Sequence, residues 1–464
     1  MHFDQMPAAP VEPAAGPWYK ELTRYHWFVL VVASLGWMFD TMDQQLFNLA
    51  RISAVRNLLN IAPGDVARSG QVNEHAGYAT TIFMIGWALG GIFFGILGDK
   101  LGRARTMLLT ILTYSAFTGL SALSVGVWDF SFYRFLTGLG VGGQFAVGVA
   151  LVAEVMPDRA RPFALGWLQA LSAVGNMLAA LTNLVLGRLE ETGAIGHAWR
   201  AMFVIGLAPA LLAIPVFRRL KEPERWKAAA AEEEEPGPGH HKLGSLSELF
   251  GVPRWRRNTI IGMLLAFAGV VGLWGIGFFS FDLVDVVFRK HFQGKGLSPQ
   301  EIAGKLTFWK GITSLVQNAG AFFGIYAFAR ITHLVGRKPA FAISFVLAAA
   351  ATAFTFWTLN EFWQIFVLIP IMGFCQLALF GGYAIYFPEL FPTRLRSTGT
   401  SFCYNVGRLV AAAGPSALGL LTSRVFAGYP EPMRYAGVTM CAVFLIGLLA
   451  LPFAPETKGK PLPE

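Results

Sequence analysis

The feature that most constrains the fold is a series of twelve apolar runs, each long enough to cross a lipid bilayer. A bilayer core is spanned by about 20 apolar residues in a helix, and a helix satisfies its own backbone hydrogen bonds where no water can. The sequence therefore predicts an all-α membrane protein with twelve transmembrane helices. We expect them at residues 27–49, 76–97, 107–125, 128–155, 163–187, 199–217, 258–287, 308–331, 339–359, 362–387, 398–423 and 433–453.

The charged residues exclude several other classes of protein. They make up 14% of the chain, against about a quarter in soluble proteins, which excludes an ordinary soluble enzyme. The net charge of +9 comes from short basic clusters between the apolar runs, so we expect no nucleic-acid partner. The three cysteines lie inside apolar runs without disulfide or metal-ligand spacing. We therefore predict no metal site and no cofactor.

Lysine and arginine concentrate in alternate connections between the apolar runs. Because cytoplasmic loops carry an excess of these residues, we expect these connections and both termini in the cytoplasm. The first apolar run is too long for the core of a cleavable signal. The interpretation is a multi-pass protein of the plasma membrane, which in bacteria is the inner membrane. The basic residues are Lys100, Arg103, Arg105, Arg159, Arg161, Arg337, Lys338, Arg394, Arg396, Lys458 and Lys460.

The longest connection divides the chain into two halves. It combines a run of glutamates with a basic patch and lacks a long apolar run, which is typical of a linker. The predicted organisation is a cytoplasmic N-terminal segment at 1–26, a six-helix bundle at 27–217, a cytoplasmic linker at 218–257, a second six-helix bundle at 258–453 and a cytoplasmic tail at 454–464.

Three motifs of the first half recur in the second half, 234 or 235 residues further along. A duplicated six-helix unit is typical of transporters whose halves rock about a site near the membrane midplane. The motif Glu154-x-x-Pro157-x-Arg159-x-Arg161 recurs as Glu389-x-x-Pro392-x-Arg394-x-Arg396, Gly102-Arg103 recurs as Gly336-Arg337, and Arg200 recurs as Arg434.

The loop from Gly98 to Arg105, which reads GDKLGRAR, resembles the G-x-x-x-D-R-x-G-R-R loop of the major facilitator superfamily. Lys100 replaces an arginine of that pattern, and Ala104 interrupts its basic run. Helix 4 adds Arg134-x-x-x-Gly138-x-Gly140, similar to the family's R-x-x-x-G-x-G motif, whose glycines let helices approach closely. The resemblance implies two pseudo-symmetric six-helix bundles.

The same resemblance implies a gate, because in this family the aspartate and arginine of the loop latch helix ends when the cytoplasmic side is closed. Charged groups at helix ends can exchange partners as the halves move. The alternative is a basic loop that only sets topology. The residues to which we assign gating are Asp99, Arg103, Glu154, Arg159, Arg161, Arg337, Glu389, Arg394 and Arg396.

Two further segments resemble the sugar-porter branch. Residues 221–226 read KEPERW, similar to its P-E-S-P-R-W signature, and residues 455–459 read PETKG, which matches its tail. The start of the chain, from Pro17 to Asp40, is similar to the proton symporters of sialate, lactate and pyruvate, and the segment from Trp37 to Asp43 also resembles nicotinate and aromatic-acid carriers. All of these substrates are carboxylates. Arg408 stands where sialate carriers typically have a small residue, which argues against sialate itself.

The first predicted helix carries two acids, Asp40 and Asp43, deep in the membrane. Asp40 lies 13 residues beyond Trp27, about 20 Å along a helix. Sugar porters and organic-acid symporters have a similar acid facing an arginine of helix 4. By resemblance we assign Asp40 and Arg134 to proton coupling, with Asp43 as the reserve candidate. The alternative is a fixed structural ion pair.

Arg408 lies about 10 residues into the eleventh predicted helix and so near the midplane. A bidentate substrate carboxylate would satisfy it, and a similar arginine in related branches is associated with anionic substrates. The alternative is a buried pair with an acid of the chain. Amides at similar depth can orient a polar ligand or bond between helices. The other predicted substrate-binding residues are Gln44, Asn48, Gln144, Gln169, Asn176, Gln317, Asn318, Gln376, Tyr383 and Asn405.

The function predicted from these features is symport of a proton with a small organic anion, such as a monocarboxylate or an aromatic carboxylate, by alternating access. The alternatives are a sugar porter and a facilitative uniporter of a small polar metabolite. The eight histidines form no catalytic or metal-binding cluster, and we predict a protein that is not an enzyme. Its expected partners are the anion, the proton and membrane lipid, and we expect a monomer.

Overall fold

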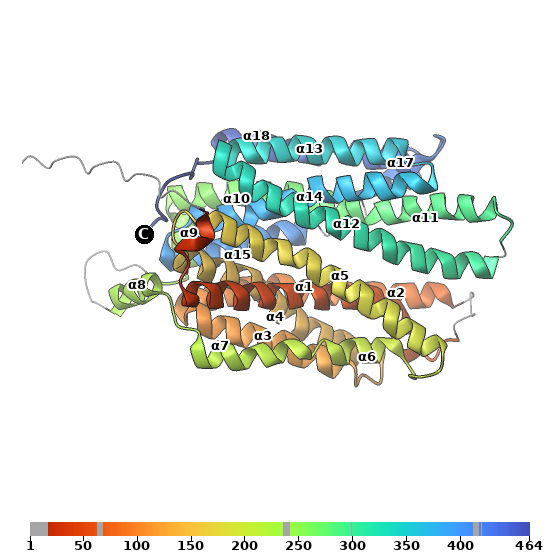
Figure 1. The fold of residues 1–464 in the computed structure, drawn as a ribbon, viewed down its shortest axis with the longest axis horizontal. Coiled ribbons are helices and arrows are strands. Elements are labelled where there is room, and N and C mark those ends of the chain that lie inside the picture. Colours follow the sequence, from red (N-terminus) through yellow and green to blue (C-terminus); the bar gives the residue numbers. More distant parts are fainter. Residues whose placement is uncertain (1–16, 63–67, 235–241, 298, 412–416, 419) are drawn as a thin grey trace, which may run out of the picture.

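The computed structural model describes residues 17–62, 68–234, 242–297, 299–411, 417–418 and 420–464. Residues 1–16 of the predicted N-terminal segment and 235–241 of the predicted linker lie outside this description. The described chain is an all-α bundle whose long helices run roughly along one common axis (Figure 1). It has the twelve-helix topology expected from the apolar runs.

The helices fall into two halves. The first half comprises α1 (Arg24–Leu58), α2 (Ser69–Lys100), α3 (Arg103–Ser121), α4 (Val127–Val155), α5 (Arg161–Glu191) and a sixth crossing of α6 (Ala198–Ile205), η2 (Ala208–Leu212) and α7 (Ala213–Arg219). The second half begins with a crossing of α10 (Pro253–Val270), η3 (Val271–Gly277) and α11 (Phe278–Gln293). It continues with α12 (Pro299–Val335), α13 (Arg337–Thr358), α14 (Ile365–Leu390), α15 (Arg396–Ala411), η6 (Leu421–Val425), α17 (Pro432–Met440) and α18 (Val443–Ala450).

Short helices lie outside the crossings. They are η1 (Trp18–Glu21), α8 (Glu224–Glu234), α9 (Leu246–Gly251), η4 (Phe362–Gln364), η5 (Thr393–Leu395) and η7 (Leu451–Phe453). Both α8 and α9 lie at one end of the bundle, which we call the linker end (Figure 1). Helix α1 begins at this end, and the tail after α18 also lies there.

Within the described residues, nine helical segments are long and apolar enough to cross a membrane by length and composition. The other three crossings are α1 and α3, in which polar residues lower the hydropathy, and α15, whose described part is only 16 residues long. Asp40 and Asp43 interrupt α1, threonines and serines recur along α3, and Arg408 interrupts α15. The helices that depart from the apolar pattern include the two that carry the predicted proton and anion sites.

Helices α2 and α4 pack backbone against backbone. A Cβ placed on Gly142 would lie 2.1 Å from the carbonyl oxygen of Trp87, and one placed on Gly90 would lie 2.0 Å from that of Leu139. Only glycine permits this separation, as expected from the glycine motif of helix 4. The second half repeats the arrangement, with Gly324 of α12 against the backbone of α14.

The starts of α3 and α13 show the same internal repeat. Gly102 (φ 107°) and Gly336 (φ 102°) precede these helices in backbone conformations that favour glycine. The Glu222 carboxylate accepts hydrogen bonds at 3.0 and 3.1 Å from backbone N–H groups in the first turn of α3. Glu456 does the same for α13 at 2.9 and 3.0 Å. Each helix thus has its N-terminus capped by a carboxylate from outside the bundle.

Candidate functional site

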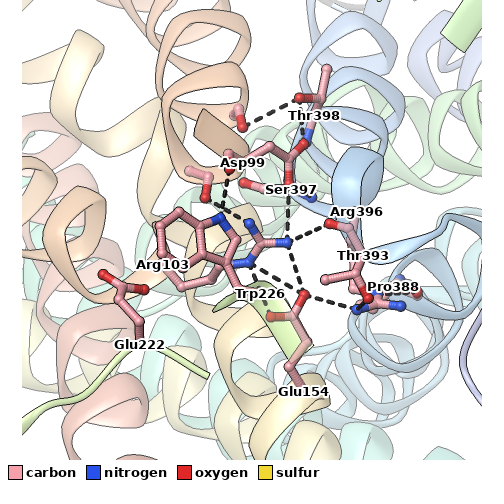
Figure 2. A network of polar contacts seen from close by, with 12 residues as sticks. Asp99, Arg103, Glu154, Glu222, Trp226, Pro388, Thr393, Arg396, Ser397 and Thr398 are labelled. Carbon is pink, nitrogen blue, oxygen red and sulfur yellow. Dashed lines mark hydrogen bonds and ion pairs between the residues drawn. The ribbon is translucent and has the colours of Figure 1, made fainter. Parts of the chain in front are cut away.

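A buried network of charges joins the two halves at the linker end (Figure 2). Arg103, at the start of α3, donates from Nε and Nη2 to the Glu154 carboxylate of α4, with an Nη2–Oε1 distance of 2.9 Å. Its Nη2 also lies 3.1 Å from Asp99 Oδ1 and donates to the backbone carbonyl of Thr393 in the second half. Arg103 therefore holds two acids of its own half and contacts the other half directly.

Asp99, at the end of α2, caps a helix of the opposite half. Its carboxylate accepts hydrogen bonds from the backbone N–H groups of Ser397 (3.0 Å) and Thr398 (2.8 Å), and from the Thr398 hydroxyl (2.6 Å). These residues form the first turn of α15, where unpaired N–H groups and the helix dipole favour an anion. The start of α15 is therefore fixed to the end of α2.

Glu154 completes the network. Its Oε1 accepts a hydrogen bond at 2.8 Å from Arg396 Nη1 of the second half, so one carboxylate is shared by guanidinium groups from both halves. Two acids and two arginines balance each other in a region where all four are buried. Buried charges are tolerated when they are paired and hydrogen-bonded in this way. We call Asp99, Arg103, Glu154 and Arg396 the latch.

The partners described for the other five predicted gating residues lie in the same half or in segments outside the crossings. Arg337 pairs with Glu389 inside the second half at 2.7 Å, and Arg394 pairs with Glu248 of α9 at 2.7 Å. Arg159 pairs with Glu21 of η1 at 2.6 Å. Arg161, the repeat counterpart of Arg396, bonds to Asp158 and to the carbonyl of Ala153. The latch is therefore asymmetric.

A cavity of about 620 Å³ lies between the halves. Residues of α1, α5, α12, α14 and α15 line it, together with Leu273. On α1 the lining runs from Trp37 to Arg51, about 20 to 40 Å from the start of the helix at the linker end. The predicted substrate-binding residues that line this cavity are Gln44, Asn48, Gln169, Asn176, Gln317, Asn318 and Arg408.

Arg408 presents unpaired donors at this cavity. Its guanidinium lies over the rings of Trp87 and Tyr404, with Cζ 4.0 and 4.1 Å from the ring centroids. Nη2 donates to the Tyr404 hydroxyl at 2.7 Å, whereas Nε and Nη1 are buried without a partner among the described residues. A buried guanidinium needs acceptors for its N–H groups, and a carboxylate is an acceptor that also carries the opposite charge.

Four other predicted substrate-binding residues do not line this cavity, and their role in substrate binding stays a prediction. Gln376 donates to the Thr352 hydroxyl at 2.7 Å, and the Tyr383 hydroxyl donates to a backbone carbonyl of α10 at 2.6 Å. Gln144 accepts a hydrogen bond from a threonine of α3, and Asn405 donates to backbone carbonyls of α15 and α4. These four residues lie at the predicted depth in the membrane, but their side chains point toward neighbouring helices.

The acids of α1 differ in their partners. Arg134 lies 3.6 Å from Asp43, which also accepts a hydrogen bond at 2.6 Å from Thr118 of α3. The predicted pairing of Asp40 with Arg134 is therefore wrong, and Asp43, the reserve candidate, takes that place. The two acids are three residues apart, which in a helix turns the side chains about 60° away from each other. Asp43 faces the interior of its own half.

Asp40 faces the cavity side of α1. Its Oδ2 accepts a hydrogen bond at 2.9 Å from Nε2 of Gln44, which lines the cavity, whereas Oδ1 is buried without a partner among the described residues. Asp40 also interacts electrostatically with Arg408. The structure thus brings the unpaired acid and the incompletely paired arginine to the same site, one from each half.

Sequence reasoning missed several residues of the lining, notably Arg51, Lys310 and Tyr404. Helical periodicity would have identified Arg51, because it follows Gln44 by seven residues and Asn48 by three and so shares their face. Lys310 and Tyr404 lie on other helices, and their approach to this face is a tertiary feature. Among the described residues, no three His, Cys, Asp or Glu side chains cluster as metal ligands.

Comparisons with known proteins agree with this arrangement. The sequence model of the Major Facilitator Superfamily matches residues 33–298, and that of the sugar (and other) transporter family matches residues 261–379. A putative metabolite transport protein of Haemophilus influenzae is 29% identical over 444 residues, covering 96% of this chain and 99% of that protein. The cis,cis-muconate transport protein of Acinetobacter baylyi is 28% identical, covering 79% and 83% of the two chains.

The fold has a counterpart among solved structures. The proton:xylose symporter XylE, in complex with 6-bromo-6-deoxy-D-glucose, superposes with a TM-score of 0.73 at 18% sequence identity, covering 94% of this chain and 98% of XylE. With a family model that matches more than half of its length, the chain is a membrane transporter of the Major Facilitator Superfamily.

Proposed function

We propose that this transporter imports a small organic anion together with a proton by alternating access. The observation that carries the proposal is the Arg408 guanidinium, which reaches the cavity with Nε and Nη1 unpaired among the described residues. An uncharged sugar would bring no counter-charge, so that Arg408 would depend on Asp40 alone, and a buried charge with poor compensation is costly. A carboxylate would supply both an acceptor for an unpaired donor and a negative charge. The cis,cis-muconate carrier among the relatives also has an organic anion as its named substrate.

Asp40 supplies the coupling in this proposal. An ionised Asp40 competes with the substrate carboxylate for the positive charge of Arg408, with which it interacts. Protonation neutralises Asp40 and leaves Arg408 to the substrate, so that loading of the anion favours uptake of the proton. The Asp43–Arg134 pair is fully buried inside the first half, and we assign it a structural role.

In this proposal the latch controls the change between the outward-facing and inward-facing states. We infer that the linker end faces the cytoplasm, because the basic connections lie there, and that the latched state receives substrate from the outside. Breaking the bonds of Arg396 and Asp99 to the opposite half would let the halves rock and release substrate inward. The proposed location is the bacterial inner membrane. Because one chain supplies both faces of the cavity, the proposed unit is a monomer in lipid.

The test is uptake of radiolabelled carboxylates and hexoses into proteoliposomes, with and without an inward proton gradient. We expect the gradient to drive carboxylate above equilibrium. Asp40→Asn should abolish this accumulation and keep exchange of substrate for substrate, while Arg408→Gln should abolish both. Hexose uptake would support a sugar porter, and gradient-independent equilibration would support a uniporter. Either result would overturn the proposal.

A further inference from the structure

We propose that Arg51 is a second anion-binding residue of this cavity, and that the substrate is a linear dicarboxylate of about six carbons held between Arg51 and Arg408. The inference rests on the proposed function, because it takes Arg408 as the first carboxylate site. Arg51 lies on the same face of α1 as Gln44 and Asn48, and all three line the cavity.

The Arg51 guanidinium has no acidic partner among the described residues. Its Nη1 donates to the Thr80 hydroxyl of α2 at 3.0 Å, and that hydroxyl in turn donates to the Ala76 carbonyl at 2.8 Å. Thr80 therefore orients the guanidinium but leaves its charge uncompensated. The other cation of the lining, Lys310, differs, because it lies 2.6 Å from Asp285.

The lining as a whole favours anions. It contains Arg51, Lys310 and Arg408 but no aspartate or glutamate among its described residues. With Lys310 paired to Asp285, and with Asp40 neutralised by the proton as proposed above, the two arginines remain as uncompensated charges. A cavity that carries two separated guanidinium groups and no carboxylate has a charge pattern complementary to a ligand with an anion at each end.

Helix α2 sets the separation of the two guanidinium groups. Arg51 contacts α2 at Thr80, and Arg408 lies over the ring of Trp87 on the same helix. These contacts are seven residues apart, which corresponds to about 10 Å along the helix axis. A six-carbon chain places its terminal carboxyl carbons about 6 Å apart at ordinary carbon–carbon bond lengths. Adding a hydrogen bond at each end lets such a molecule reach both arginines when it lies obliquely to α2.

The groups between the two arginines suit the middle of such a ligand. Asn48 lies between Gln44 and Arg51 on α1, and Leu273 and Phe380 supply apolar surface. On the facing side, Asn176 of α5 and Asn318 of α12 are hydrogen-bonded to each other at 3.0 Å. The cavity of about 620 Å³ is in the usual range for a small ligand with accompanying water.

The experiment compares adipate with its monomethyl ester, which has the same carbon chain and one charge fewer. Binding of each to purified transporter is measured at one salt concentration, and proton-driven uptake is measured in proteoliposomes. We expect wild-type protein to bind adipate at least about tenfold more tightly than the ester, the worth of one additional charge-assisted hydrogen-bond pair. In Arg51→Gln this ratio should fall to about one, and Arg51→Lys should restore part of it.

A variant that reverses the charge of residue 51 provides a second test. Arg51→Glu should gain affinity for 6-aminohexanoate, whose far end is a cation, and lose affinity for adipate. The matched control is Arg188→Gln, which removes an exposed guanidinium at the far end of α5, outside the lining, and should leave both affinities unchanged.

The outcomes separate this inference from the proposed function. Proton-driven uptake of both compounds with equal affinity, or an equal loss of both in Arg51→Gln, would overturn the dicarboxylate assignment and leave the symport proposal standing. An Arg51-dependent preference for adipate without proton-driven uptake would support the assignment and overturn the coupling. Failure of both compounds to bind would overturn both.

Discussion

The Arg408 guanidinium owes its orientation to the Tyr404 hydroxyl and to the two aromatic rings over which it lies. Tyr404→Phe keeps a ring in place and removes only the hydrogen bond. We expect a loss of carboxylate affinity of about tenfold, because a hydrogen bond to a charged group contributes about 1.5 kcal/mol while the cation–π contact remains.

The control for that variant is Tyr383→Phe. It makes the same chemical change in a tyrosine whose hydroxyl donates to the Leu265 carbonyl and lies outside the cavity lining. Equilibrium binding of labelled substrate checks both variants. Equal losses in the two would mean that the Tyr404 hydroxyl acts on general packing and not on Arg408.

Substitutions of the two acids of α1 are expected to differ in their effect on the stability of the fold. Asp43→Ala leaves Arg134 buried with no acid, and removing one partner of a buried pair costs about 3 to 5 kcal/mol. Asp40→Asn keeps an acceptor for Gln44 and removes an unpaired charge, so the fold should lose little. Thermal unfolding in detergent should show a melting temperature several degrees lower for Asp43→Ala alone. The reverse order would contradict the structural role of Asp43.

At the residue scale, the sequence predicted which side chains could bind a ligand better than it predicted where those side chains point. The depth of Arg408 in an apolar helix identified it as a residue that needs an anion, and it lines the cavity. Depth alone did not distinguish Gln169, which lines the cavity, from Gln144, which bonds to α3. Which face of a helix meets the other half depends on the packing of several helices, and one sequence does not contain that information.

The close contact of α2 and α4 makes a prediction at the scale of helices. Gly142→Ala places a Cβ 2.1 Å from the Trp87 carbonyl oxygen, whereas Gly148→Ala on the same helix meets nothing within 4 Å. We expect Gly142→Ala to push the helices apart, lower the melting temperature and weaken substrate binding through the displaced Trp87. Gly148→Ala should be neutral or slightly stabilising. Size-exclusion chromatography and thermal unfolding would show any departure.

The cap on α13 predicts a pH dependence of stability. Burial raises the pKa of Glu456, but backbone N–H groups of Arg337, Lys338, Thr457 and Lys458 outweigh it and hold the pKa below its ordinary value of 4.5. A group whose pKa is lower in the folded state stabilises the fold above its unfolded pKa and loses that contribution as the pH falls through the folded pKa. In Glu456→Gln the melting temperature should therefore fall less between pH 6 and about pH 3. Parallel curves for the two proteins would refute the cap.

The helices could be predicted from the sequence because the length and hydropathy that a bilayer requires are properties of each apolar run by itself. The described parts of all twelve predicted runs correspond to helices or to crossings of consecutive helices, while residues 412–416 and 419 of the eleventh run lie outside the description. Interruptions were not foreseen. The sixth crossing contains the 3₁₀ segment at Ala208–Leu212, and the seventh contains the π-helical segment at Val271–Gly277. Local changes of helix type need only one shifted hydrogen bond, which an apolar pattern does not record.

At the scale of the whole molecule, the asymmetry of the latch predicts unequal effects of two equivalent arginines. Arg396→Ala removes a hydrogen bond between the halves, whereas Arg161→Ala removes hydrogen bonds within the first half and only a longer-range electrostatic interaction with Glu389 of the second half. Spin labels at two exposed positions of the linker end, Arg105 and Leu334, report the separation of the halves. We expect the label distance to grow in Arg396→Ala and to stay near the wild-type value in Arg161→Ala. Equal shifts would contradict an asymmetric latch.

Sequence repeats predicted which charges would occupy the linker end but not which of them would join the halves. Glu154 and Glu389 are equivalent in sequence, yet only Glu154 binds an arginine of the opposite half in the described structure. A repeat specifies the same local geometry twice. The conformational state of the whole transporter decides which copy is engaged.

The charge of the cavity lining also has a consequence for the solution around the protein. Two guanidinium groups in one lining attract mobile counter-ions, and we expect chloride to occupy the substrate-free cavity for part of the time. A substrate then binds by displacing chloride, and its apparent affinity depends on which buffer salt is present. The transported anion must therefore compete with chloride for the cavity before it can bind.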